Sequence, residues 1–100
     1  MELTLPFDLR YAATGTTFKL PEADYGYLIG NGSSRLLRAI VGDGLARELV
    51  LTEREMSAEE AADVGLVSRI VPSEQLESIV REVAEDIAAK PPLGIELNKR

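Results

Sequence analysis

The sequence predicts an α/β fold in a single domain over residues 1–100, with short strands and several helices. Two short extended stretches, 8–13 and 16–20, flank the turn signal Thr14-Gly15. Later in the chain, apolar residues recur with helical spacing from Leu76 to Ile87. No linker, repeat or low-complexity tract divides the chain, whose length suits one small domain.

At the N-terminus, residues 2–7 alternate between apolar and polar side chains, a pattern typical of a strand. Residues 8–13 predict a second strand. After the Thr14-Gly15 turn, residues 16–20 predict a further extended stretch, which Pro21 closes because it cannot donate to a sheet ladder.

Two helices are expected in the middle of the chain. The loop Gly30 to Ser34 leads into the first, and Gly42 closes it. Asp43 is expected to cap the second. The apolar residues of the two helices recur at helical spacing; they are Leu36, Leu37, Ile40 and Val41, then Leu45, Ala46, Leu49 and Val50.

A capping box marks the next helix. Ser57 stands at the N-cap position and Glu60 at N3, so that each side chain can bond the other's backbone N–H. This short helix should run to Val64 and stop at Gly65, a residue that readily adopts the left-handed conformation of a helix end.

The remaining chain predicts a strand over 66–71 and the longest helix over about 73–90. Pro91 breaks that helix, and Pro92, in a first-turn position, opens a last one that runs to Arg100. The side chains expected to face inward on the long helix are Leu76, Ile79, Val80, Val83 and Ile87.

Composition excludes several classes of function. A net charge of −6 argues against a nucleic-acid or anionic-membrane partner. The chain has no cysteine, which excludes disulfides and thiolate metal sites, and no histidine, which excludes a histidine base or a zinc site of the usual kind. No metal is expected, and acid–base chemistry falls to carboxylates, tyrosines or lysines. With neither a leader nor an apolar run of membrane length, the expected location is cytoplasmic.

Five segments, in order along the chain, resemble the second half of a subunit of the enoyl-CoA hydratase/isomerase (crotonase) family. They are residues 2–13, 17–26, 41–52, 57–67 and 87–93. The resemblance implies a partial ClpP/crotonase fold. It also implies a short helix that starts before Glu2, where the local alternation favours a strand and where Pro6 fits only the first turn.

The resemblance assigns catalytic roles to Glu2 and Glu22. In the family two carboxylates face one thioester and handle the water and the proton, as general acid–base chemistry requires. Taken alone, each glutamate would be one surface acid among the 17 acidic residues. The implied substrate is an α,β-unsaturated acyl-CoA thioester, with no separate cofactor. Keeping both carboxylates favours a hydratase, while isomerase and other crotonase reactions stay open.

Candidate substrate-binding residues follow the second glutamate. Tyr25 could line an acyl pocket, with partly buried packing as the alternative. Gly30, Asn31 and Gly32 form a loop that in the family lines the acyl pocket. The same loop could cradle a phosphate at a helix N-terminus, but a turn followed by a helix cap is favoured.

Two departures from the family pattern concern loops. The family loop after the second glutamate often reads P-G-x-G-G-T, whereas here residues 29–34 lack the proline and one glycine. Glu53 follows Thr52 where the family usually has glycine, a change expected to touch only a turn.

A family subunit is more than twice the length of this chain, and the glycine-rich segment that supplies an oxyanion donor precedes the first glutamate. Losing one such donor typically raises a barrier by about 2.7–4 kcal/mol. The chain is therefore expected to be a fragment or split half, inactive alone, that forms a homo-oligomer or pairs with a crotonase-type N-terminal half. The alternative is a non-catalytic remnant or subunit-interaction module.

Overall fold

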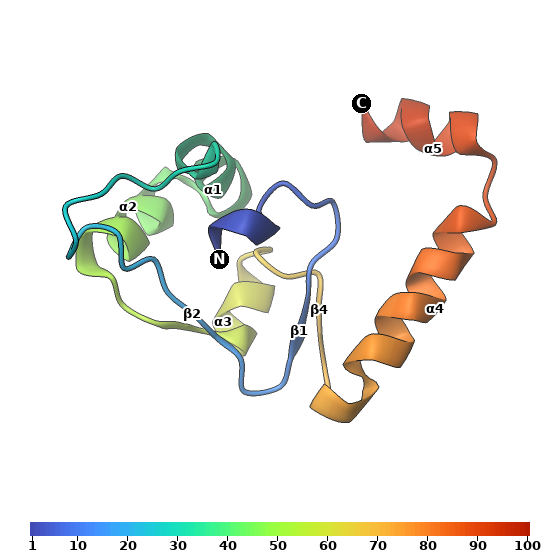
Figure 1. The fold of residues 1–100 in the computed structure, drawn as a ribbon, viewed down its shortest axis with the longest axis horizontal. Coiled ribbons are helices and arrows are strands. Elements are labelled where there is room, and N and C mark those ends of the chain that lie inside the picture. Colours follow the sequence, from blue (N-terminus) through green and yellow to red (C-terminus); the bar gives the residue numbers. More distant parts are fainter.

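Helices dominate the structure, and its short strands pair two by two (Figure 1). The computed structural model describes residues 1–100. In chain order the elements are a 3₁₀-helix η1 (Glu2–Thr4), β1 (Tyr11–Ala13), β2 (Thr17–Phe18), α1 (Ser33–Val41), α2 (Asp43–Thr52), β3 (Met56–Ser57), α3 (Ala58–Asp63), β4 (Arg69–Val71), a 3₁₀-helix η2 (Ser73–Gln75), α4 (Leu76–Ala88) and α5 (Pro92–Lys99).

The strands form two separate ladders. β1 runs parallel to β4, with Ala12 opposite Ile70, and β2 runs antiparallel to β3, with Thr17 opposite Ser57. The strands are shorter than the predicted 8–13, 16–20 and 66–71 because extended backbone counts as a strand only where a partner lies in register. β3 was not predicted, since two residues are too few to show an alternation.

The N-terminal segment is helical, as the resemblance implied, and not the strand that its alternation is typical of; the helix begins at Glu2 rather than before it. Leu5 ends η1 with its N–H bonded to the carbonyl of Glu2, and its side chain is buried. Pro6 lies just beyond the helix, where its missing N–H leaves no helical hydrogen bond unmade.

Helices α1 and α2 meet at a single residue, Gly42. Its φ of 83° and ψ of 159° are accessible to glycine and not to residues with a Cβ, so one helix ends and the next begins without a longer loop. Asp43 does not cap α2 as expected, because Gly42 takes the N-cap position. Its carboxylate instead pairs with Arg38 at 3.2 Å and Arg47 at 2.8 Å, which joins the two helices on their exposed side.

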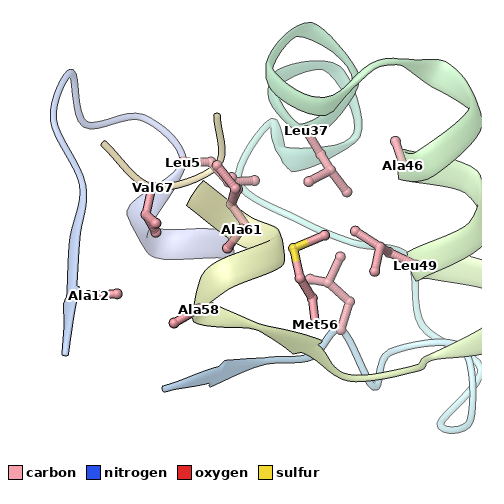
Figure 2. Packing of buried hydrophobic residues seen from close by; sticks show 11 residues of the cluster. Leu5, Ala12, Leu37, Ala46, Leu49, Met56, Ala58, Ala61 and Val67 are labelled. Atoms are coloured by element: carbon pink, nitrogen blue, oxygen red, sulfur yellow. The ribbon is translucent and has the colours of Figure 1, made fainter. Parts of the chain in front are cut away.

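The hydrophobic core lies where α1, α2, α3 and the strands converge (Figure 2). Leu37, Leu49 and Met56 project into the same space from α1, α2 and β3. Leu37 and Met56 are fully buried and are among the largest side chains removed from water, together with Leu20 and Leu66. The members of the cluster are Leu5, Ala12, Leu20, Leu37, Ala46, Leu49, Met56, Ala58, Ala61, Leu66 and Val67.

The N-terminus of α3 forms half of the predicted capping box. The Ser57 hydroxyl accepts the N–H of Glu60 at 3.1 Å, as predicted. The Glu60 carboxylate does not return to Ser57. It accepts two hydrogen bonds from the Arg54 guanidinium, at 2.5 and 2.9 Å, and Arg54 also donates to Glu48. A bidentate charged pair outcompetes a bond to one neutral N–H, and it ties the end of α2 to the start of α3.

Helix α4 departs most from expectation. It begins at Leu76 rather than at residue 73, because η2 comes first. Only part of its length contacts β1 (Figure 1). Leu76, Ile79 and Val83 are half-buried, but Val80 is 40% exposed and Ile87 36% exposed. The prediction that the whole stripe is buried is therefore wrong for Val80 and Ile87, and Val80 borders an open hollow between α4 and β1.

Helix α5 begins at Pro92, as predicted, and ends at Lys99. The Lys99 ammonium pairs with Asp8 at 2.5 Å, so the C-terminal helix is linked to the segment after η1. None of the helices combines the length and the apolar character needed to cross a bilayer.

Truncating one core residue should show where the stability lies. Leu37→Ala removes a fully buried side chain and should lower the free energy of unfolding by about 2–5 kcal/mol. Leu51→Ala is the matched control, because Leu51 is 76% exposed and its loss should change stability by about 0.5 kcal/mol or less. Urea denaturation followed by circular dichroism measures both, and equal losses would contradict the assigned core.

The Arg54 bridge should make stability depend on acid pH. The two hydrogen bonds from Arg54 lower the pKa of Glu60, and Glu60 in turn raises the pKa of Arg54. A carboxylate with a lowered folded-state pKa stabilises the fold above its unfolded pKa, and this stabilisation is lost as pH falls through the folded value.

Arg54→Met should therefore lower the melting temperature at pH 7, and the gap between variant and wild type should close as pH drops below about 4. Thermal melts across a pH series measure it. A gap of constant size from pH 7 to pH 3 would show that Arg54 stabilises by packing alone.

Candidate active site

Glu2 is anchored to a loop far along the chain. The η1 helix places its side chain so that Oε1 accepts the backbone N–H of Gly30. A Cβ built at Gly30 would lie 3.8 Å from Oε2, an ordinary contact, so the bond requires the N–H and not the missing side chain of glycine. The first predicted catalytic residue is thus brought against the first residue of the predicted substrate loop.

Arg10 supports the segment that carries Glu2. Its guanidinium donates to the carbonyl oxygens of Phe7 and Leu66, both at 2.5 Å. Its backbone is also bonded to Ser68, so this residue holds the turn after η1 against the chain that leads into β4. Sequence reasoning missed Arg10, since nothing in the local pattern shows which distant carbonyls a guanidinium will reach.

The loop that follows is a left-handed turn into α1. Asn31 and Gly32 have φ values of 52° and 74°, and Gly32 is the N-cap of α1 without a side-chain cap. The carbonyl of Gly30 accepts the N–H of Ser33 at 2.7 Å. Because the Gly30 N–H already bonds the Glu2 carboxylate, a phosphate at this point would meet a like charge. The geometry favours the turn-and-cap interpretation over a phosphate cradle.

Glu22 begins a tight turn over residues 22–27. Its carbonyl accepts the N–H of Tyr25 at 3.2 Å and of Tyr27 at 2.8 Å. The residue is half-buried, and its Oε2 is buried without a hydrogen-bond partner. A buried polar oxygen that makes no hydrogen bond within the protein is uncommon.

Glu53 holds this turn from the other side. It ends α2 with φ 53°, the left-handed conformation that suits glycine. Its Oε1 accepts the backbone N–H of Asp24 at 2.5 Å, while its Oε2 is buried without a partner. Glu53 is only 6% exposed. The sequence predicted a turn at Glu53 and missed the contact of its side chain. The only available signal for that contact was the glutamate itself, at a position where the family usually has glycine.

The two tyrosines of this turn are both exposed, but only one of them lines a hollow. Tyr25 is 73% exposed, and its side chain makes no hydrogen bond. Tyr27 instead lines a hollow of about 570 Å³, bounded by residues 23–29 and helices α1 and α2. Neither Glu2 nor Glu22 lines this hollow, although its wall continues directly from Glu22. A hollow of about 660 Å³ lies elsewhere, between β1 and α4.

The structure therefore assembles two parts of a site. One part joins Glu2 to Gly30, and the other joins Glu22, Tyr25 and Asp24 to Glu53 in one turn. No hydrogen bond links the carboxyl groups of the two predicted catalytic residues.

Comparison with known proteins decides the family. The sequence profile of the enoyl-CoA hydratase/isomerase family matches residues 1–100. The chain belongs to the enoyl-CoA hydratase/isomerase family. The resemblance inferred from five ordered segments is thus confirmed.

Relatives in this family are named as hydratases. The chain is 31% identical to the short-chain-enoyl-CoA hydratase of Clostridium acetobutylicum over 99 residues, 99% of this chain and 38% of the relative. It is 40% identical to (E)-benzylidenesuccinyl-CoA hydratase of Thauera aromatica over 101 residues, 100% of this chain and 39% of the relative. The chain thus spans less than two-fifths of the length of these enoyl-CoA hydratase/isomerase family members.

Solved structures of the family share the fold. An enoyl-CoA hydratase subunit from Geobacillus kaustophilus superposes with a TM-score of 0.93 at 36% identity, over 98% of this chain and 38% of the other. The enoyl-CoA hydratase of Bacillus anthracis gives a TM-score of 0.90 at 38% identity, over 97% and 38%. The predicted α/β, crotonase-like fold class is confirmed.

Proposed function

We propose that this chain carries the two acid–base carboxylates of a hydratase that adds water to an α,β-unsaturated acyl-CoA thioester. The observation that supports this most is the contrast between the two glutamates. The Glu2 carboxylate is held by a backbone N–H, and a buried oxygen of Glu22 has no partner. An anchored carboxylate can orient a water, and an unpartnered oxygen is available to a proton.

The chemistry needs three contributions. The water oxygen bonds to Cβ of the substrate while a carboxylate accepts one of its protons. Electron density moves to the thioester oxygen as an enolate, and Cα then takes a proton from a carboxylic acid. Glu2 and Glu22 share these two proton transfers in our proposal, and backbone N–H donors elsewhere in the whole protein stabilise the enolate oxygen.

The names of relatives support this class of reaction, the addition or removal of water. Beside the hydratases above, the carnitinyl-CoA dehydratase of Salmonella agona is 36% identical over 94 residues, 94% of this chain and 36% of the relative. Dehydration is the reverse of hydration and uses the same proton transfers. The acyl group in the proposal is therefore an α,β-unsaturated thioester or its β-hydroxy product.

Removing either carboxylate should abolish hydration. The test protein is this chain joined to the preceding segment of the Clostridium acetobutylicum hydratase, so that an entire family-length subunit is present. Glu2→Gln and Glu22→Gln should each lower kcat on crotonyl-CoA by roughly 10²–10⁴-fold, the usual contribution of general acid–base catalysis. Loss of the enoyl absorbance measures the rate.

Glu55→Gln is the matched control, because Glu55 is exposed and its carboxylate makes no hydrogen bond. It should leave kcat within about two-fold, as expected of a surface change. The 100-residue chain alone should show no turnover. Full activity of the Glu2→Gln and Glu22→Gln proteins would remove the proposed roles.

Exposed apolar residues favour a second candidate, a subunit-interaction module. No residue of α4 or α5 is buried, and Val80, Ile87, Leu93 and Leu97 are exposed large hydrophobics. Apolar side chains gathered on two neighbouring helices commonly mark a surface of association. We propose that α4 and α5 pack against a second copy of the chain or another family subunit.

Light scattering after size exclusion tests this association. The wild-type chain should elute with a mass above one copy that rises with concentration, whereas the double variant Val80→Lys and Ile87→Lys should elute as one copy. Glu82→Lys, on the same helix, adds charge without removing an apolar side chain and should behave as wild type. A compact wild-type monomer at all concentrations would argue against association.

A further inference from the structure

We propose that Glu53 is a positioning residue for Glu22, acting through the backbone N–H of Asp24. The inference rests on the proposed function for its catalytic consequence, and on the geometry of the 22–27 turn for its structural part. It concerns a position where the resemblance anticipated glycine.

The first argument is connectivity. Within residues 22–27 the other hydrogen bonds are local, from Tyr25 and Tyr27 to Glu22 and from Gly26 to Ala23. The bond from Asp24 to the Glu53 carboxylate is the only hydrogen bond that ties the turn to another element. Residues 23–27 are all exposed, so packing adds little restraint. Glu22 itself is half-buried close to the buried Leu20, so packing holds it on one side, and the bond to Glu53 holds the turn that follows it.

The second argument is that Glu53 is unfavourable for stability. A side chain at φ 53° is strained where glycine is not, and helix ends of this type usually carry glycine. Its carboxylate is buried with one oxygen unpartnered, which is also costly. Two unfavourable features at one residue, together with a bond to the turn of a candidate catalytic residue, point to a role in the site.

If Glu53 is unfavourable for stability and needed for the site, replacing it should lower activity without lowering stability. Glu53→Gly relieves the backbone strain and removes the buried carboxylate, so the melting temperature should stay equal or rise. The turn should loosen, because Asp24 loses its acceptor. Glu53→Gln keeps an oxygen that can accept the Asp24 N–H and should preserve the turn.

The first experiment measures amide hydrogen exchange in the 100-residue chain by NMR. In Glu53→Gly the Asp24 amide should exchange roughly ten- to a hundred-fold faster than in wild type, the change expected when a charge-assisted hydrogen bond is lost. Glu53→Gln should retain most of the protection. Equal protection of Asp24 in all three proteins would overturn the inference.

The second experiment measures kinetics in the joined protein described above. Glu53→Gly should lower kcat on crotonyl-CoA by about 10²-fold with little change in KM, as a small misplacement of a catalytic group does. Glu53→Gln should restore most of kcat. A parallel fall of kcat and melting temperature in Glu53→Gly would indicate a merely structural role and overturn the inference.

Glu22→Gln separates the two proposals. If Glu22→Gln is fully active, the proposed function fails, and the Asp24 exchange still decides whether Glu53 orders the turn. If Glu22→Gln is inactive and Glu53→Gly retains wild-type kcat, the proposed function stands and positioning by Glu53 is wrong.

Discussion

Burial around Met56 is the constraint on which the rest of the structure depends. This residue sits at the start of a two-residue strand, yet its side chain meets Leu37 of α1 and Leu49 of α2 (Figure 2). Because β3 leads directly into α3, the same contact also fixes where α3 begins. The two glutamates lie on segments at the margin of this core: Glu2 lies in η1, and Glu22 follows β2 after the buried Leu20.

Two carboxylate–amide bonds then define the candidate site. Glu2 accepts the N–H of Gly30, and Glu53 accepts the N–H of Asp24. Each joins segments that are distant in sequence, and each uses a charged acceptor, the stronger kind of protein hydrogen bond. The site is thus organised by side chains that reach backbone groups of loops, so that the loops need no regular structure of their own.

Local chemistry predicted the helices well. Gly42, Ser57 and Pro92 mark helix ends for reasons contained in one or two residues, and each was found near the expected place. Strand lengths were not predictable in the same way, because pairing partners such as Tyr11 and Arg69 are far apart in sequence. The stripe on α4 shows which side is apolar and cannot show whether a neighbour covers Val80 and Ile87.

The candidate site shows the same difference between local features, which could be predicted, and long-range contacts, which could not. Resemblance supplied Glu2, Glu22 and the loop residue Gly30. The bonds that Gly30 donates to Glu2 and Asp24 donates to Glu53 use backbone N–H groups that every non-proline residue has, so the sequence carries no signal for either bond. For Glu53, neither the backbone conformation nor the side-chain contact could be derived from the local sequence. The family's glycine indicated only a turn here, whereas the left-handed backbone of Glu53 and the bond that its carboxylate accepts from Asp24 were found in the structure.

The parallel pairing of β1 with β4 has a consequence for how the chain is made. Arg10 and Ser68, 58 positions apart, must meet at the entrance of this ladder. Parallel, non-local pairs form slowly because a long loop must close before any contact compensates for its entropy. On a ribosome that adds about 5–20 residues per second, β1 emerges seconds before β4 exists. During that interval the edge of β1 is open to other strands, and an unpaired edge is where chains associate wrongly.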